Sequence, residues 1–249
     1  MINIMLSGAN GKMGKVITRL VSGMEDVKIC VGVDINTESV DFPVFASPFE
    51  YEGACDVIID FSHPSVFDKL LDYAVEKNVP IVMATTGLSE ENRRRLTEES
   101  EKIPVFFSAN MSLGVNLLID LAKKATAVLE DNFDIEIIER HHNQKIDAPS
   151  GTALAIADAI ADTASENKNY VYDRHSVRKK RSKDEIGIHA VRGGTIVGEH
   201  DVIFAGTDEI IEIRHTAMSK EIFAVGAIKA AKFMAGKPAG YYSMNDLFA

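Results

Sequence analysis

A short stretch near the middle of the chain brings together side chains that can move protons. His141, His142 and Lys145 can each donate a proton or pair with a carboxylate. Histidine is the side chain whose unperturbed pKa lies nearest to physiological pH. The stretch is therefore a candidate for acid chemistry, with ordinary solvated loop residues as the alternative. A metal site is less favoured, because adjacent residues of an extended strand point to opposite faces and the two histidines could not easily bind one ion.

The sequence on either side predicts a strand before these residues and a helix after them. Residues 133–138 are apolar and β-branched, and apolar residues recur with helical spacing from Ala153 onward. Pro149 prevents the helix from beginning earlier, Ser150 is a good N-cap, and Gly151 lets a ligand approach the backbone closely. The free N–H groups of such a helix start predict an anion-binding site next to the proton donors.

A second motif, near the beginning of the chain, predicts a dinucleotide site. A short apolar strand at residues 2–6 leads into Gly8, Gly11 and Gly14, and a helix follows. In this G-x-x-G-x-x-G spacing, Gly8 permits a tight turn, Gly11 a close approach of pyrophosphate, and Gly14 close packing of helix on strand. Glycine-rich turns without a ligand are common, so the motif alone leaves that alternative open.

The next strand, residues 27–33, ends in Asp34, which lies 20 positions after Gly14. A carboxylate there suits the ribose 2′-hydroxyl of NAD and would repel the 2′-phosphate of NADP. The alternative is a residue that caps a turn. No arginine follows Asp34, and Lys12 is the nearby candidate for contact with a 2′-phosphate. We predict that NADH is used at least as well as NADPH.

The order of the remaining elements predicts an α/β protein with a Rossmann-type parallel sheet and a second, α+β domain. Strands at 57–61 and 80–84 alternate with a helix at 66–75, which is typical of a parallel sheet. Ligands bind at the carboxyl ends of such strands, where Ala84–Gly87 and Ser108–Ser112 lie, although both segments could be ordinary turns.

After a helix at 114–129 and the proton-donor stretch, the chain predicts a mainly antiparallel sheet. Glycine turns separate three strands, at 186–192, 195–204 and 209–216, which we expect to form an antiparallel meander. A last helix covers 222–234. The basic run at 178–183 is expected to be a solvated face, with attraction of an acidic substrate as the alternative.

Composition limits the possible partners and the compartment. The chain has 249 residues and a net charge of −10, which argues against nucleic acid or an anionic membrane surface as the main partner. Cys30 and Cys55 form neither a disulfide framework nor a paired metal motif, so a cytoplasmic location is expected. No apolar run approaches the roughly 18 residues of a membrane span.

The pattern E-x-H-H-x-x-K-x-D-A-P-S-G-T-A from Glu139 to Ala153 closely resembles the signature of the dihydrodipicolinate reductase family. Segments similar to the family's nicotinamide-side segments stand at Ala84–Gly87 and Ser108–Ser112. The resemblance implies NAD(P)H-dependent reduction of 4-hydroxy-2,3,4,5-tetrahydrodipicolinate, a small dicarboxylate, in diaminopimelate and lysine biosynthesis. The alternatives are another NAD-dependent reductase of a small acid and a dinucleotide-sensing protein without turnover.

The resemblance and the chemistry together assign the residues. His141 and Lys145 are the expected proton donors, Glu139 and Asp147 the groups that orient them, and no metal is expected. Expected substrate contacts are His142, Ser150, Gly151 and Thr152. Expected cofactor contacts are Gly8, Ala9, Asn10, Gly11, Lys12, Met13, Asp34, Ala84, Thr85, Thr86, Ser108, Ala109, Asn110 and Met111.

The resemblance also implies a division of the chain and an assembly. Residues 1–112 and 220–249 are expected to form the dinucleotide-binding domain, and residues 113–219 the domain for substrate binding and tetramerisation. Family members are typically homotetramers that assemble through the second sheet. Lys220 stands where relatives commonly carry arginine, and it keeps the charge but not the fork geometry.

Overall fold

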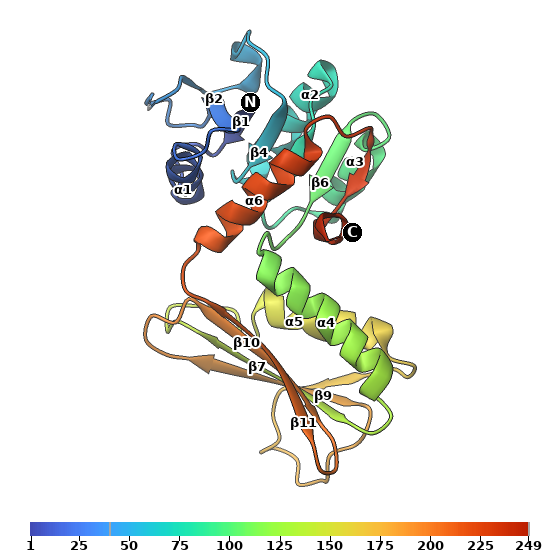
Figure 1. Ribbon diagram of the computed structural model, residues 1–249. Helices are drawn as coiled ribbons and strands as arrows, with labels where there is room; N and C mark the ends of the chain where they lie inside the picture. Colours follow the sequence, from blue (N-terminus) through green and yellow to red (C-terminus); the bar gives the residue numbers. More distant parts are fainter. Residues whose placement is uncertain (40, 249) are drawn as a thin grey trace. The chain divides into compact units, whose positions relative to one another are not determined.

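In the computed structural model, residues 1–39 and 41–248 are described (Figure 1). The chain divides into two units. The first comprises Met1–Leu113 and Glu221–Ala249, and the second comprises Gly114–Lys220. Among the described residues, no helix is both long and apolar enough to cross a membrane.

The first unit is built on a seven-stranded parallel sheet in the order β12-β6-β5-β4-β1-β2-β3. Helices cover both faces of this sheet, and its central strands are therefore apolar on both sides. Helices α1 and α6 pack on one face and form one hydrophobic core, and α2 and α3 pack on the other face and form a second core. The strands are β1 Ile2–Ser7, β2 Val27–Val33, β3 Val44–Phe45, β4 Val57–Asp60, β5 Ile81–Met83, β6 Pro104–Phe107 and β12 Gly240–Tyr242. The helices are α1 Lys12–Val21, α2 Phe67–Lys77, α3 Glu90–Glu99 and α6 Glu221–Met234, with short 3₁₀ turns at Pro48–Glu50, Pro64–Val66 and Met244–Leu247.

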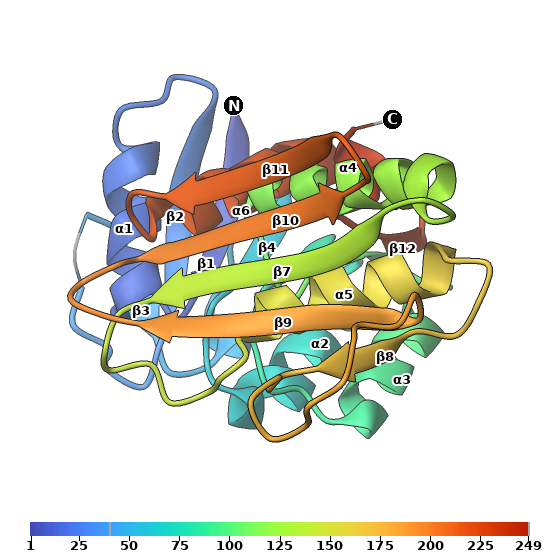
Figure 2. The same ribbon diagram turned by 90° about the horizontal axis from the view of Figure 1, so that it is seen from below.

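The second unit is a five-stranded sheet in the order β11-β10-β7-β9-β8, with α4 and α5 on one face (Figure 2). We call the helix-covered face the inner face; on β7 it carries Ile135, Ile137, Glu139 and His141, which alternate with more exposed residues. The elements are α4 Leu113–Leu129, β7 Asp134–His141, α5 Gly151–Thr163, β8 Asn169–Val171, β9 Glu185–Arg192, β10 Gly198–Ala205 and β11 Ile210–Ala217.

The predicted fold class is confirmed, but the predicted three-stranded meander is wrong. β9 and β10 are not neighbours, because β7 lies between them, parallel to β9 and antiparallel to β10. The sheet is therefore mixed. Residues 193–197 cross the end of β7, where the Gly193 N–H donates to the His141 carbonyl (2.9 Å) and the Asn143 N–H donates to the Gly194 carbonyl (3.2 Å). The crossing brings β9 and β10 to both sides of the proton-donor stretch.

The basic run is only partly the solvated face that its composition predicted. Arg181 has a side chain only 17% exposed, and its guanidinium pairs with Asp134 at 2.9 Å and with Glu136 at 3.1 Å. Lys179 pairs with Glu185 at 2.9 Å. These ion pairs tie the run to the beginnings of β7 and β9, at the opposite end of β7 from His141.

Candidate active site

The glycine turn of the first unit has the geometry of a phosphate cradle. Gly8 adopts φ +78°, and a Cβ there would lie 2.6 Å from the Phe61 carbonyl oxygen. A Cβ at Gly14 would lie 2.2 Å from the Gly8 carbonyl oxygen, which shows that helix α1 packs directly on the turn. Gly11 caps α1 without a side-chain hydrogen bond. The N–H groups of the first helical turn are thus directed to a site that an anionic phosphate can fill.

Asp34 lies beside this turn, at the end of β2. Its Oδ2 accepts a hydrogen bond from the Asn10 N–H (2.9 Å), and its Oδ1 accepts one from the Asn36 N–H (3.0 Å). Asn10 also donates through Nδ2 to the Asn36 carbonyl (2.7 Å). The carboxylate is therefore fixed between the turn and the strand end, while Lys12 is exposed at the helix start.

The other expected cofactor residues lie at the ends of β5 and β6, where several side chains have structural roles. The Thr85 hydroxyl is buried and donates to Asp60 Oδ2 (2.7 Å), and the Met111 side chain is in the core. Ser108 donates through Oγ to the Asn110 carbonyl (2.7 Å), which closes the turn. Any contact from Thr85 or Met111 to a cofactor would therefore come from the main chain. Ala84 is buried here, and Thr86 and Ala109 are exposed. Of the expected residues near the glycine turn, Ala9 is buried and Met13 is half-buried.

Glu139 is the centre of the proton-donor stretch in the second unit. Its side chain is fully buried, and its Oε2 lies 2.7 Å from His141 Nδ1. Its Oε1 accepts a hydrogen bond from the Ser150 N–H at 3.0 Å. Arg192 donates to both oxygens, from Nη1 to Oε2 and from Nη2 to Oε1, at 2.7 Å each. Groups from β7, β9 and the start of α5 thus meet on one carboxylate.

These contacts fix the protonation of Glu139 and the orientation of His141. Burial raises the pKa of Glu139, but hydrogen bonds from Arg192, His141 and the Ser150 N–H outweigh it and hold that pKa below its usual value. An ionised carboxylate only accepts hydrogen bonds, so His141 donates from Nδ1. His141 Nε2 then faces Gly198, where a Cβ would lie 3.1 Å from it. Nε2 is thus the ring nitrogen that does not bond to Glu139.

Ser150 begins α5 as predicted. Its Oγ accepts a hydrogen bond from the Ala153 N–H (3.2 Å) and lies 3.2 Å from His200 Nε2. A Cβ added at Gly151 would meet no described atom within 4 Å, so the helix start is open on that side. The Gly151 N–H is directed to the Asp147 carboxylate and helps to lower its pKa, which shows that this helix start attracts an anionic group.

His200 belongs to this site although the sequence did not indicate it. Its ring is 4% exposed and packs edge-to-face on the His141 ring, with centroids 5.3 Å apart. Burial and the neighbouring His141 lower the pKa of His200 to about 4, so the ring is neutral at pH 7. Its Nδ1 has no hydrogen-bond partner among the described residues. Only the pairing of β10 with β7, which places His200 opposite Glu139, could have revealed it.

Lys145 and His142 lie in the loop between β7 and α5. Lys145 Nζ pairs with Asp147 Oδ1 at 2.8 Å, and its side chain is 23% exposed. That hydrogen bond from Lys145 holds the pKa of Asp147 below its usual value. His142 is half-buried, and its carbonyl accepts the Lys145 N–H at 3.1 Å. Within residues 1–39 and 41–248, no group of three or more His, Cys, Asp or Glu side chains could hold a metal ion.

A parallel sheet that begins with this glycine turn is typical of a dinucleotide-dependent oxidoreductase, and the second unit adds buried side chains of a kind that can transfer protons. Residues 2–111 match the family described as "Dihydrodipicolinate reductase, N-terminus", and residues 114–248 match "Dihydrodipicolinate reductase, C-terminus". The chain belongs to the dihydrodipicolinate reductase family.

Relatives and a solved structure agree over the full length. The chain is 53% identical to the 4-hydroxy-tetrahydrodipicolinate reductase of Clostridium tetani, covering 98% of this chain and 96% of the relative. It is also 53% identical to that of Caldanaerobacter subterraneus subsp. tengcongensis, with coverage of 99% and 98%. The dipicolinate-bound dihydrodipicolinate reductase from Paenisporosarcina sp. TG-14 has a TM-score of 0.84 and 26% identity, over 98% of this chain and 99% of the other.

Proposed function

We propose that the protein catalyses the NAD(P)H-dependent reduction of (2S,4S)-4-hydroxy-2,3,4,5-tetrahydrodipicolinate to 2,3,4,5-tetrahydrodipicolinate, with loss of water, in diaminopimelate and lysine biosynthesis. The observation that carries this proposal is the grouping of Glu139, His141 and the open start of α5 in a chain of this family. A helix start favours a carboxylate as its ligand, and dipicolinate, a small dicarboxylate, is bound in the Paenisporosarcina relative.

The residues of the second unit divide the work between binding and proton transfer. The bound dinucleotide supplies a hydride to ring C4 of an unsaturated imine. The N–H groups of Gly151 and Thr152 hold a substrate carboxylate, with Ser150 fixing the helix start and His142 adding a charge-assisted contact. His141, through Nε2, and Lys145, through Nζ, supply the proton that the electron-rich intermediate requires.

For the cofactor, we propose that NADH is used at least as well as NADPH. The fixed carboxylate of Asp34 would accept a hydrogen bond from a ribose 2′-hydroxyl and repel a 2′-phosphate. Comparing kcat/KM for the two cofactors tests this, and a preference for NADPH of about a hundredfold would contradict it, since 2–3 kcal/mol would then favour the phosphate.

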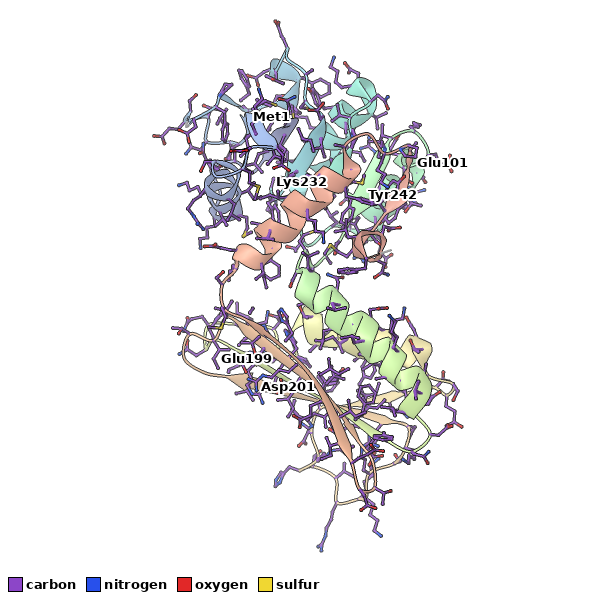
Figure 3. The ribbon with its side chains drawn as sticks, in the orientation of Figure 1. Met1, Glu101, Glu199, Asp201, Lys232 and Tyr242 are labelled. Atoms are coloured by element: carbon purple, nitrogen blue, oxygen red, sulfur yellow. The ribbon has the colours of Figure 1, made fainter. Side chains whose placement is uncertain are left out.

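We further propose that the protein is a cytoplasmic homotetramer that assembles through the outer face of the second sheet, opposite α4 and α5. No helix among residues 114–220 covers that face (Figure 2). Glu199 and Asp201 of β10, labelled in Figure 3, lie on it, because they pair with Arg140 and Ile138 of β7, which alternate with the inner-face residues. Arg140 pairs with Asp201 at 2.5 Å, and Asp201 is only 8% exposed. Sedimentation equilibrium should give four times the 27.3 kDa chain mass, whereas a monomer would contradict the proposal.

The reaction is tested by following NADH oxidation with the substrate generated in place by the preceding synthase from pyruvate and aspartate semialdehyde. Turnover should depend on the synthase and on both of its substrates. Binding of NADH without its oxidation under these conditions would contradict the proposed reaction. It would still support the proposed dinucleotide site.

A further inference from the structure

Arg192, the last residue of β9, contacts both carboxylate-bearing residues of the proton-donor stretch. Its guanidinium donates to the two oxygens of Glu139 at 2.7 Å each. The same Nη2 that reaches Glu139 also donates to the Asp147 carbonyl at 2.6 Å. The side chain is 19% exposed, so water screens these contacts only partly.

Each of these contacts leads to one of the two proton donors. Glu139 Oε2 holds His141 Nδ1 at 2.7 Å, and Asp147 Oδ1 holds Lys145 Nζ at 2.8 Å. Residues 142–150, which contain Lys145, form no regular helix or strand. A single planar guanidinium therefore spans from the strand that carries His141 to the loop that carries Lys145.

We propose that Arg192 is a positioning residue for both proton donors. It keeps Glu139 ionised, so that His141 stays in the tautomer that frees Nε2, and it holds the Asp147 main chain, and with it the loop and Lys145. This inference rests on the proposed function. Lysine at this position would keep the charge but could not make the two-pronged contact and reach Asp147 at once.

A purely structural ion pair makes a different prediction from a positioning residue. If Arg192 only stabilises the fold, Arg192→Lys lowers the melting temperature and leaves the chemistry of the folded enzyme unchanged. If it positions the donors, Arg192→Lys lowers kcat by about 10²-fold, as expected for donors displaced by about an ångström, while KM for both substrates stays within about threefold.

The pH profile separates the two roles further. Glu139 is faced by His141 from β7, Arg192 from β9, the Ser150 N–H before α5 and the buried His200 ring from β10. Without the arginine fork, burial of Glu139 is less fully offset, and the acidic limb of the kcat profile should move to higher pH. An unmoved limb with a kcat within threefold of the wild type would overturn the proposal.

Arg95→Lys is the matched control. Arg95 also bridges two carboxylates, those of Asp68 (2.6 Å) and Asp72, but it does so on α3 in the first unit. Its replacement should leave kcat and the pH profile unchanged. A similar kcat loss in Arg95→Lys would overturn the assignment of a special role to Arg192.

Two measurements on the free protein test the inference without any turnover. Nitrogen-15 NMR of the histidine rings should show His141 protonated at Nδ1 in the wild type and a mixture of tautomers in Arg192→Lys. Hydrogen exchange of the amides of residues 142–148 should be at least about tenfold faster in the variant, because the loop loses its anchor. Unchanged tautomer and exchange would overturn the proposal even if the proposed reaction were correct. The predicted changes would support it even if the substrate proved to be different.

Discussion

Glu139 shows why a buried charge is present in this fold. Its carboxylate accepts hydrogen bonds from Arg192, His141 and the Ser150 N–H, and so all of its strong acceptor directions are used. An ion buried this completely costs several kcal/mol unless its partners compensate. One of these partners, His141, carries the proposed chemistry, so a contact that offsets the cost of burial also fixes His141.

Replacing Lys145 with alanine should remove one proton donor. We expect kcat to fall by about 10²–10⁴-fold, the usual effect of an acid–base group, with little change in NADH binding. Steady-state kinetics and NADH titration provide the measurement. Lys124→Ala is the control, because Lys124 is also paired with an aspartate, Asp120, at 2.9 Å, but on the exposed side of α4. A Lys145→Ala enzyme with a near wild-type kcat would count against the role.

Replacing Asp34 with serine should shift cofactor choice toward NADPH. Serine keeps a hydrogen-bonding group but removes the charge, and a hydrogen bond to a charged group is worth about 1.5–3 kcal/mol. The ratio of kcat/KM for NADPH to that for NADH should therefore rise about tenfold or more. Asp208→Ser, at an exposed turn position, is the control and should leave the ratio unchanged. A ratio that does not move in Asp34→Ser would remove the carboxylate from cofactor selection.

The start of α5 and the end of β7 form the candidate site together because of how the second sheet is ordered. β7 lies between β9 and β10, so its last residues meet Arg192 on one side and residues of β10 on the other. The loop at 193–197 closes over that end of the strand. A simple meander of β9 with β10 would have left His141 at a sheet edge, with Arg192 and His200 on the wrong strands.

Ser150→Ala tests the helix start. The serine Oγ accepts the Ala153 N–H and meets His200 Nε2, so its loss should destabilise the second unit by about 1–2 kcal/mol. We expect KM for the dicarboxylate to rise more than kcat falls, because the helix start binds the ground state as well as the transition state. Ser89→Ala, which removes the cap of α3, is the control: it should cost similar stability and leave KM unchanged. An unchanged KM in Ser150→Ala would separate the cap from substrate binding.

Local pattern predicted most elements and failed where pairing decides the structure. The N-cap at Ser150 and the helices α4 and α6 follow from capping residues and apolar periodicity within one segment. Helix α3 was missed because only Leu96 of its ten residues is buried, so it has no apolar period. Arg192 and His200 were missed because each meets Glu139 or Ser150 from more than 45 residues away in the chain. Spacing in a sequence does not carry strand order.

The two units divide the requirements of the proposed reaction between them. The glycine turn and Asp34 belong to the unit that contains the last helix, and the proposed proton donors belong to Gly114–Lys220. The net charge of −10 makes the positive groups around the α5 start the more important for a dicarboxylate, because the chain as a whole repels it. Those groups must therefore keep their charges, and the neighbouring buried histidine its neutrality, over the working pH range.

The neutral state of His200 in the folded protein should make the free energy of unfolding depend on pH. Burial lowers the pKa of His200 to about 4, whereas an unfolded histidine titrates near 6.5. Between these values the unfolded chain binds the extra proton, so stability is complete above about pH 6.5 and is lost as the pH falls toward 4, by about 3 kcal/mol from this residue. Burial lowers the pKa of His215 as well, which adds a loss of the same sign.

The ion-paired carboxylates affect stability in a lower pH range than His200 does. The contribution of His200 can therefore be measured separately. Hydrogen bonds from Arg174 and Lys179 lower the pKa of Glu185 to about 2, so its contribution is lost only as the pH falls below about 4.5. Urea unfolding followed by far-UV circular dichroism between pH 4.5 and 7 should therefore show a slope that His200→Gln flattens, since glutamine can still meet Ser150 Oγ but does not titrate. His175→Asn, at an exposed position, is the control. Parallel plots of stability against pH for the wild type and His200→Gln would contradict the prediction. They would mean that His200 accepts a proton in the folded enzyme, so that His141, the proposed proton donor, would have a charged neighbour.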